Sequence, residues 1–372
     1  MTNTENTIHP KIKTKAETML VMAGGTGGHV FPALAVAKEL SENGVRIVWL
    51  GTRKGIESTL VPKAGYDICY LRISGLVGSG LSRKLVAPFM LFFAILQSLL
   101  VILKERPKCV LGMGGFASGP GGIAAKFLNK KVIIHEQNAY AGLTNRKLAT
   151  IADSILTGFR SCEGLPETSI WVGNPVRKEI EIKIRTDQDQ DGTFKILILG
   201  GSQGAKSLNE NLPASISEIA AKQPIRVWHQ TGAGKSADVN KNYLGLDQFK
   251  SVIVEEFITN IEVAYSWADI VICRAGAMTI SELMAAGKPA VLIPFPYAAG
   301  DHQTKNARFM VQAEAAILIA DDQLNQPQFT KKLLKLLASP EKLTAMSNNA
   351  AELHRPTAAK QVAEFCRVYL HA

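Results

Sequence analysis

Residues 19–37 read MLVMAGGTGGHVFPALAVA, and residues 195–205 read KILILGGSQGA. In both stretches a short run of strand-forming apolar residues ends in a glycine-rich loop. In the first stretch the loop is followed by a run with helical spacing from Pro32 to Leu40. Glycine lets the backbone approach an anion closely, and a helix N-terminus offers unpaired N–H groups. The two stretches therefore predict one anion-binding strand–loop–helix unit in each half of the chain.

The same alternation of short apolar runs and helical segments continues through both halves. It is typical of parallel sheets covered by helices on both faces, so we expect an α/β protein with two Rossmann-like domains facing each other across a cleft. Open sheets of this kind bind ligands outside the carboxyl ends of their strands. The expected strands are 19–23, 46–50, 109–111, 132–134 and 154–156, then 195–199, 226–229, 251–255, 269–273, 290–293 and 316–319.

The length of 372 residues also favours two domains. The first residues are polar and then basic, without the apolar core of a secretory signal. The five cysteines are scattered singly, which is typical of reduced thiols in a cytosol and not of a disulfide framework or a zinc site. The expected division is a disordered lead-in (1–15), a first domain (16–172), a linker (173–194), a second domain (195–345) and a helical segment (346–372) that could pack back on the first domain.

Charge is distributed unevenly along the chain. Residues 1–176 contain 20 lysines and arginines against 11 acids, whereas residues 177–372 contain 22 against 21. A basic first half beside a nearly neutral second half indicates that the first domain meets a polyanion. Nucleic acid is not expected, since basic and aromatic residues are not interleaved and no recognition motif is present. An anionic membrane surface is the better candidate.

The run LVAPFMLFFAILQSLLVIL (85–103) contains no charged residue and is flanked by Arg83, Lys84, Lys104 and Arg106. Its length would allow it to cross a membrane, but Pro88, the polar pair Gln97 and Ser98, and its place between soluble α/β units argue against a span. Two other interpretations remain open. The run forms either a buried helix or a helix with one exposed face that sinks into the bilayer interface.

A third glycine-rich loop, GMGGFASG (112–119), also follows an expected strand, and three such loops suit substrates that carry diphosphates. The spacing excludes two cofactor motifs. Val30 occupies the third glycine position of the dinucleotide fingerprint, and His229 stands where a phosphate-binding GxxxxGKS loop begins with glycine. No cofactor and no metal site are expected. Asp187, Asp189 and Asp191 mimic an alternating carboxylate site, but they lie in the polar linker, where we expect them to be solvated.

Together these stretches resemble the MurG family of glycosyltransferases, which transfer N-acetylglucosamine to undecaprenyl-pyrophosphoryl-N-acetylmuramyl-pentapeptide. The resemblance runs from residue 24 to residue 307 in family order, and it implies the two-domain GT-B fold with the donor mainly on the second domain and the acceptor on the first. The stretches are GGTGGHVFPALAVA (24–37), MGGFASGP (113–120), HEQNAYAGLTN (135–145), GNPVR (173–177), GGSQGA (200–205), HQTG (229–232), EEFI (255–258), RAGAMTISE (274–282) and DHQTKNA (301–307).

The resemblance implies a role for each matching residue. The first glycine loop lines the cleft near the diphosphate and the sugar, the helix start at 277–282 faces phosphate through its N–H groups, and its glutamate binds the ribose hydroxyls. At position 304 this chain has threonine, where many relatives have a second glutamine. The implied substrate-binding residues are Thr26, Gly27, Gly28, Asn138, Arg177, Ser202, Ile258, Ala277, Met278, Thr279, Ile280, Ser281, Glu282 and Gln303.

The implied reaction is an inverting attack of the acceptor's 4-hydroxyl on the anomeric carbon of UDP-N-acetylglucosamine. A helix N-terminus, a serine and an arginine suit the departing diphosphate without a metal. A base must take the acceptor's proton, and histidine is suited near neutral pH. His29, beside the first glycine loop, is the first candidate, and His135 is the second.

The implied setting is the cytoplasmic face of the inner membrane, with peripheral attachment and a cell-wall synthesis complex as a further partner. Three alternatives remain at this stage. The chain could be a GT-B transferase for another lipid or small-molecule acceptor, a non-catalytic binder of nucleotide sugar or lipid diphosphate, or, more remotely, a nicotinamide-dependent oxidoreductase.

Overall fold

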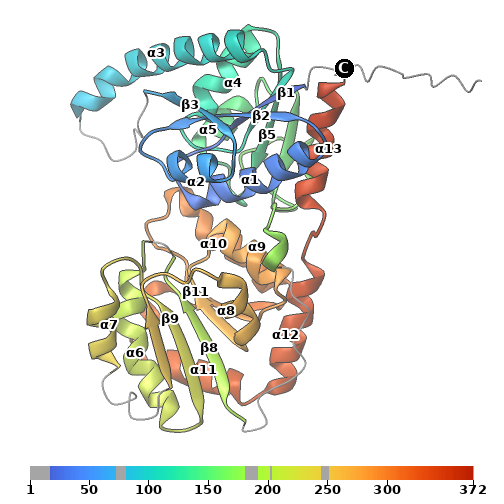
Figure 1. Ribbon diagram of the computed structural model, residues 1–372. Helices are drawn as coiled ribbons and strands as arrows, with labels where there is room; N and C mark the ends of the chain where they lie inside the picture. The colour runs from blue at the N-terminus through green and yellow to red at the C-terminus, as the bar shows by residue number, and fades with distance from the viewer. Residues whose placement is uncertain (1–16, 73–80, 181–191, 202, 244–250, 372) are drawn as a thin grey trace, which may run out of the picture.

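The computed structural model describes residues 17–72, 81–180, 192–201, 203–243 and 251–371. The expected lead-in at 1–15, Ser202 and residues 181–191 of the expected linker lie outside this part of the chain. The described residues form two parallel sheets, each covered by helices on both faces, and the two sheets belong to separate lobes (Figure 1). The expected fold class of two Rossmann-like domains is confirmed.

The first sheet has seven strands in the order β3-β2-β1-β4-β5-β6-β7, and all its neighbouring strands are parallel. All five expected strands are present. The sequence did not predict β3 and β7, because β3 is an edge strand interrupted by polar residues and β7 has only two residues. The strands are β1 (Thr18–Met22), β2 (Arg46–Thr52), β3 (Asp67–Leu71), β4 (Cys109–Gly112), β5 (Lys131–Glu136), β6 (Ser154–Thr157) and β7 (Ile170–Trp171).

The second sheet has six parallel strands in the order β10-β9-β8-β11-β12-β13, all of which were expected. In both sheets the strand order reverses beside the first strand, between β1 and β4 and between β8 and β11. Loops diverge at such a point and leave a crevice at the carboxyl ends of the strands. The strands are β8 (Phe194–Leu199), β9 (Ile225–Gln230), β10 (Val252–Glu255), β11 (Ile270–Cys273), β12 (Ala290–Leu292) and β13 (Ala316–Leu318).

Helices bury apolar residues on both faces of the first sheet. One face packs on α1 (Gly27–Glu42), α2 (Glu57–Lys63) and α13 (Ala358–Leu370), and the other on α3 (Leu81–Glu105), α4 (Ser118–Phe127) and α5 (Leu143–Leu148). The last helix, α13, lies beside α1, so the chain ends on the first lobe (Figure 1). This return gives the two lobes a second covalent connection besides the segment after β7.

The second sheet is enclosed in the same way. One face packs on α8 (Ile261–Trp267), α9 (Ala277–Ala285) and α10 (His302–Gln312), and the other on α6 (Lys206–Ala220), α7 (Ser236–Asn242) and α11 (Pro327–Leu337). The helix α12 (Pro340–Glu352) contributes to both cores. Short 3-10 turns complete the chain: η1 (Lys178–Ile180), η3 (Ala299–Asp301) and η4 (Asp321–Gln323).

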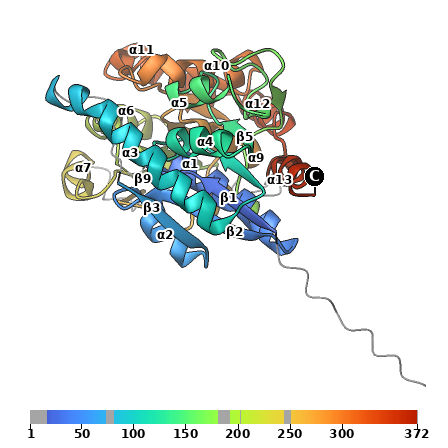
Figure 2. The ribbon, with the colours of Figure 1, turned by 90° about the horizontal axis from the view of Figure 1, so that it is seen from above.

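The apolar run at 85–103 lies within α3, which forms the outermost layer of the first lobe over α4 (Figure 2). By length and composition Ala87–Glu105 could cross a membrane, yet only 17% of it is buried in the protein. Ala94, Ser98 and Ile102 form the buried stripe, spaced four residues apart as on one helix face. The interpretation of this run as a buried helix is therefore wrong, because most of its large side chains face outward.

Candidate active site

His29 is the third residue of α1, directly after the first glycine loop, and it is half-buried. Its Nδ1 lies 3.2 Å from the carbonyl oxygen of Gly24. With hydrogen on Nδ1 donating to this oxygen, Nε2 keeps a free lone pair. Burial lowers the pKa of His29, and the nearby Glu136, the Gly24 carbonyl and Glu57 oppose this effect only in part. The ring is therefore neutral near pH 7 and can accept a proton at Nε2.

The first glycine loop packs directly against the glycine-rich loop at 112–119. A side chain at Gly114 would meet the His29 ring, and one at Gly115 would meet the carbonyl oxygen of Gly24. Both glycines also have positive φ angles, of 95° and 84°. Ser118 then starts α4 and donates to the carbonyl oxygens of Met22 and Gly114, each at 2.8 Å. The His29 ring thus lies on a surface that only glycine permits.

A buried carboxylate braces the first glycine loop from below. Glu57, at the start of α2, is fully buried, and its Oε2 accepts from the N–H of Gly25 at 2.9 Å. Its Oε1 accepts from the N–H and the hydroxyl of Thr52, at 2.9 and 2.8 Å. The end of β2 and the loop after β1 are thereby held together through one side chain. Thr26 and Gly25 remain exposed at the loop's outer edge.

A second buried carboxylate shapes the loop that follows β5. Glu136 accepts at Oε1 from the backbone N–H and the side-chain amide of Asn138, both at 3.0 Å. Its Oε2 accepts from the N–H of Gly142 at 3.1 Å and from the side-chain amide of Asn145 at 2.8 Å. Four hydrogen bonds to one carboxylate fix the position of Asn138, the residue expected to contact the sugar.

His135 does not lie in the cleft. It is fully buried in β5, and its Nε2 lies 2.9 Å from the carbonyl oxygen of Gly173, at the start of the expected linker. Burial lowers its pKa to about 4. In this position the ring holds the segment after β7 against the first sheet. Its geometry matches a structural histidine, and His29 is the better placed base.

Asn306, in α10, joins the two lobes at the same loop. It is fully buried, and its Oδ1 accepts from the N–H of Ala139 at 2.8 Å. Its amide nitrogen donates to Asn138 Oδ1 and to the carbonyl oxygen of Ala275, both at 3.2 Å. Beside it, Lys305 forms an ion pair with Glu163 of the first lobe. The loop bearing Asn138 is therefore docked on the second lobe.

A second polar bridge crosses the lobes at Asn174. Its amide donates to the carbonyl oxygen of Gln137 and to the hydroxyl of Ser281, both at 2.9 Å. The Ser281 hydroxyl in turn donates to the carbonyl oxygen of Ala277 at 2.9 Å, and this side chain is buried. Ser281 thus serves the contact between the lobes in this structure.

The helix α9 begins at Ala277, after β11 and an extended Gly276. The first bond that closes a helical turn runs from the N–H of Ile280 to the carbonyl oxygen of Gly276, at 2.9 Å. The N–H groups of Ala277, Met278 and Thr279 precede that bond and point out of the helix end. They are the donors that can meet an anion, whereas the Ile280 side chain is part of the core.

Glu282 lies about one turn further along α9, near Arg177, another residue that is expected to bind the sugar nucleotide. Its Oε2 accepts from the hydroxyl of Tyr265 at 3.0 Å, and its Oε1 lies 3.9 Å from Nη2 of Arg177. Burial raises the pKa of Glu282, and Arg177 and Tyr265 act to lower it. The guanidinium of Arg177 also lies over the ring of Phe31 from α1, 5.2 Å from its centre. Arg177 therefore bridges α9 and the helix that carries His29.

Ile258 follows β10 and lines an open cavity of about 550 Å³. Its N–H donates to Oε1 of Gln230 at 3.1 Å, and its side chain is buried. Trp228, Phe257 and Val263 supply apolar walls, so the cavity suits a flat ring such as a base.

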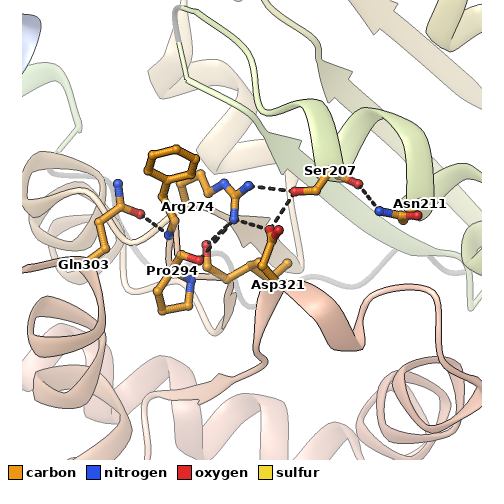
Figure 3. Close-up of polar contacts among 8 residues, drawn as sticks. Ser207, Asn211, Arg274, Pro294, Gln303 and Asp321 are labelled. Carbon is orange, nitrogen blue, oxygen red and sulfur yellow. Dashed lines mark hydrogen bonds and ion pairs between the residues drawn. The ribbon is translucent and has the colours of Figure 1, made fainter. Parts of the chain in front are cut away.

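Gln303, in α10, turns its side chain towards the loop after β12. Its Oε1 accepts from the N–H of Phe295 at 2.9 Å, which leaves the amide nitrogen as a donor (Figure 3). Thr304, next to it, donates its hydroxyl to Oδ1 of Asp301 at 2.6 Å. Gln303 is thus placed by the same loop that borders Arg274.

The sequence interpretation missed several residues that position this site. Glu57 and Asp321 belong to none of the recognised stretches, and Ser207 lies just beyond one of them. No short-range signal marks Glu57, since it is 32 residues from the loop that it braces. Within the described residues, no three histidine, cysteine or acidic side chains are grouped as metal ligands.

Comparisons with known proteins agree with this geometry. The profile of the glycosyltransferase family 28 N-terminal domain matches residues 19–157, and that of the C-terminal domain matches residues 195–362. A UDP-N-acetylglucosamine–N-acetylmuramyl-(pentapeptide) pyrophosphoryl-undecaprenol N-acetylglucosamine transferase from Shewanella sp. (strain MR-4) is 46% identical over 94% of this chain and 96% of its own length. The transferase of the same name from Shewanella denitrificans is 44% identical over 95% of this chain and 98% of its own.

Solved structures show the same similarity in three dimensions. The crystal structure of Acinetobacter baumannii MurG superposes with a TM-score of 0.81 at 36% identity, covering 94% of this chain and 99% of that one. The glycosyltransferase of kitacinnamycin superposes with a TM-score of 0.74 at 15% identity, covering 96% of this chain and 100% of that one. The second match shows a shared fold alone.

Proposed function

The chain belongs to the MurG family of glycosyltransferase family 28, and we infer from the geometry above how its residues divide the family's reaction between the two lobes. Its activity is the transfer of N-acetylglucosamine from UDP-N-acetylglucosamine to undecaprenyl-pyrophosphoryl-N-acetylmuramyl-pentapeptide, a step in peptidoglycan synthesis. The observation that supports the division is that α1, which carries His29, lies against α9, whose N-terminus is open, and that Arg177 contacts both helices.

The N-terminus of α9 receives the donor's diphosphate. The N–H groups of Ala277, Met278 and Thr279 carry the partial positive charge of the helix end, and Arg177 adds a full charge nearby. As the bond between the anomeric carbon and the diphosphate breaks, negative charge builds on the leaving oxygen. Donors already oriented towards that oxygen lower the barrier without rearranging.

Glu282 and Ile258 hold the nucleoside. Tyr265 donates to one carboxylate oxygen of Glu282, and the other oxygen, 3.9 Å from the Arg177 guanidinium, accepts from the ribose hydroxyls. The carbonyl of Ile258 and the apolar walls beside it accommodate uracil. The loop with Ser202 would complete the phosphate contacts, although that residue lies outside the part of the chain described.

His29 acts as the base on the acceptor side. The 4-hydroxyl of N-acetylmuramic acid attacks the anomeric carbon from the face opposite the diphosphate, and its proton passes to Nε2 of His29. The new glycosidic bond forms as UDP leaves, so the configuration inverts. Asn138 and Gln303 place the N-acetylglucosamine between these groups, with Thr26, Gly27 and Gly28 lining the other wall.

The reaction can be tested directly with purified protein. We expect UDP release and a disaccharide-lipid product only when UDP-N-acetylglucosamine and a prenyl-pyrophosphoryl-N-acetylmuramyl-pentapeptide are both present. Activity should persist in EDTA, because α9 and Arg177 stabilise the leaving group in this scheme. Binding of UDP without turnover of any acceptor, or loss of activity on chelation, would contradict the proposal.

We also propose that α3 attaches the protein peripherally to the cytoplasmic face of the inner membrane. Phe89, Leu100 and Leu103 are each more than half exposed, as are the paired rings of Phe92 and Phe93. Lys104 at the end of the helix is also exposed and can meet acidic headgroups. An apolar surface with a basic border is typical of interfacial helices. A cell-wall synthesis complex remains a further proposed partner.

Vesicle co-sedimentation tests this attachment. Anionic vesicles that contain phosphatidylglycerol should retain the protein, and Phe92→Asp with Phe93→Asp should weaken binding by about tenfold or more. Val368→Asp, the same change at an exposed apolar residue of α13, serves as the matched control. In 0.5 M salt the electrostatic screening length is on the order of 4 Å, so attraction to the headgroups is weak. If the double variant in this salt bound the vesicles as well as wild-type protein does, the proposed attachment would be refuted.

A further inference from the structure

Arg274 links the carboxyl ends of four neighbouring strands in the second sheet (Figure 3). It directly follows β11, and its Nη1 donates to the carbonyl oxygens of Ile293 and Pro294, after β12, both at 3.2 Å. The same nitrogen donates to Oδ1 of Asp321, after β13, at 2.6 Å. Its Nη2 donates to the hydroxyl of Ser207, in α6 after the β8 loop, at 2.7 Å.

Ser207 closes this network. Its hydroxyl donates to Oδ1 of Asp321 at 2.6 Å while it accepts from Arg274, and the amide of Asn211 donates to its carbonyl oxygen at 2.9 Å. The side chains of Arg274 and Asp321 are only 14% and 22% exposed. A planar guanidinium with several donors can join these groups at once, which an ammonium cannot do.

Arg274 and two of the residues that it contacts, Ser207 and Phe295, are close in sequence, or bonded, to groups that we propose to bind the sugar nucleotide. Three residues after Arg274, α9 begins with the N–H groups assigned to the diphosphate. Ser207 lies two residues after the 200–205 loop, which carries Ser202. The Arg274 guanidinium also lies over the ring of Phe295, 5.5 Å from its centre, and the N–H of Phe295 holds Gln303.

We propose that Arg274, Ser207 and Asp321 form a positioning clamp for the donor nucleotide, an inference that rests on the function proposed above. The clamp residues touch no reacting atom. They fix the spacing between the 200–205 loop, the start of α9 and the loop after β12 that holds Gln303, so that all three meet one diphosphate sugar. Loosening the clamp therefore weakens donor binding more than it slows turnover at saturation.

Ser207 offers the gentlest test, because its removal leaves the ion pair of Arg274 with Asp321 in place. We expect Ser207→Ala to raise the Kd for UDP, measured by titration calorimetry, about tenfold, the effect of one charge-assisted hydrogen bond. The KM for UDP-N-acetylglucosamine should rise in parallel, with kcat and the acceptor KM within about twofold. Ser207→Thr keeps the hydroxyl and should restore binding.

Ser217→Ala is the matched control. Ser217 lies on the same helix and donates to the carbonyl oxygen of Pro213 at 2.9 Å, so the chemical change is the same away from the clamp. It should leave UDP binding unaltered. Arg274→Lys should weaken UDP binding beyond the Ser207→Ala effect, because a single ammonium cannot bond all four partners.

The outcomes separate the clamp from the underlying function. If wild-type protein fails to bind UDP, the proposed function fails with it. If wild-type protein binds UDP and Ser207→Ala binds equally well, the clamp is refuted. A lower Tm for Ser207→Ala with an unchanged Kd would likewise overturn the inference, because it would leave the network a purely structural role.

Discussion

The replacement Glu57→Gln tests how the first glycine loop is held. The carboxylate is fully buried and accepts three hydrogen bonds, one from Gly25 and two from Thr52. Glutamine has nearly the same shape, but one of its two terminal atoms is an NH₂ donor. If the amide oxygen keeps both Thr52 bonds, the NH₂ group faces the N–H of Gly25, and two donors meet.

The cost follows from these contacts. One hydrogen bond to a buried carboxylate is lost and two donors are brought face to face, which costs about 2–3 kcal/mol. For a domain of roughly 150 residues, each kcal/mol lowers the Tm by about 2–4 °C, so a drop of about 4–12 °C is expected. The free loop would also misplace His29, so kcat should fall.

Differential scanning calorimetry measures the Tm, and Glu167→Gln is the control because Glu167 is exposed. The control should change the Tm by less than about 1 °C, as is usual for surface substitutions. A Glu57→Gln protein with the Tm and kcat of wild type would show that the carboxylate does not brace the loop.

Three further predictions concern the proposed roles. His29→Gln should lower kcat by about 10²–10⁴-fold and leave the Kd for UDP unchanged. Because burial lowers the pKa of His29, the wild-type rate should fall only below pH 6.5 as the pH is lowered, and this fall should be absent in the variant. Glu282→Gln should raise the Kd for UDP about tenfold without changing the stability of the protein. If wild-type protein bound UDP and diphosphate analogues without uracil equally well, this would argue against nucleoside binding at Glu282. The pKa of His135 is about 4 in the folded protein and 6.5 in the unfolded chain. The stability that the neutral ring contributes is therefore complete above pH 6.5 and is lost as the pH falls towards 4, about 3 kcal/mol in total. In denaturant titrations, the free energy of unfolding of His135→Asn should depend on pH less steeply than that of wild type between these values, by about one proton, and an unchanged dependence would contradict the assignment.

The fold was largely readable from the sequence, because its signals are local. Apolar runs that end in glycine mark the strands and the turns that follow them, and all eleven expected strands are present. The two missed strands, β3 and β7, have weak patterns and lie at sheet edges, where one neighbouring strand supports them and fewer apolar residues are needed. Glycines at 114 and 115 could be flagged as loop residues, but their contacts with His29 and Gly24 depend on how two distant loops meet.

The candidate site shows the same difference between local signals and long-range contacts. His29, Arg177 and Glu282 belong to recognisable stretches, so residue type and motif suffice to nominate them. How the site residues are held depends on partners far along the chain. Glu57 holds the first glycine loop, Asn306 holds Asn138, and Asp321 holds Arg274. Local sequence carries no record of such pairings.

The sequence by itself determined that this protein has two parallel-sheet lobes with glycine-rich loops after their first strands, because strand, turn and helix preferences act over a few residues. Only the tertiary structure decided that His135 is buried, that α3 exposes its apolar face, and that a buried arginine joins four strand ends. Burial and pairing arise when segments separated by tens to hundreds of residues pack together, and that packing sets which side chains meet solvent, substrate or one another.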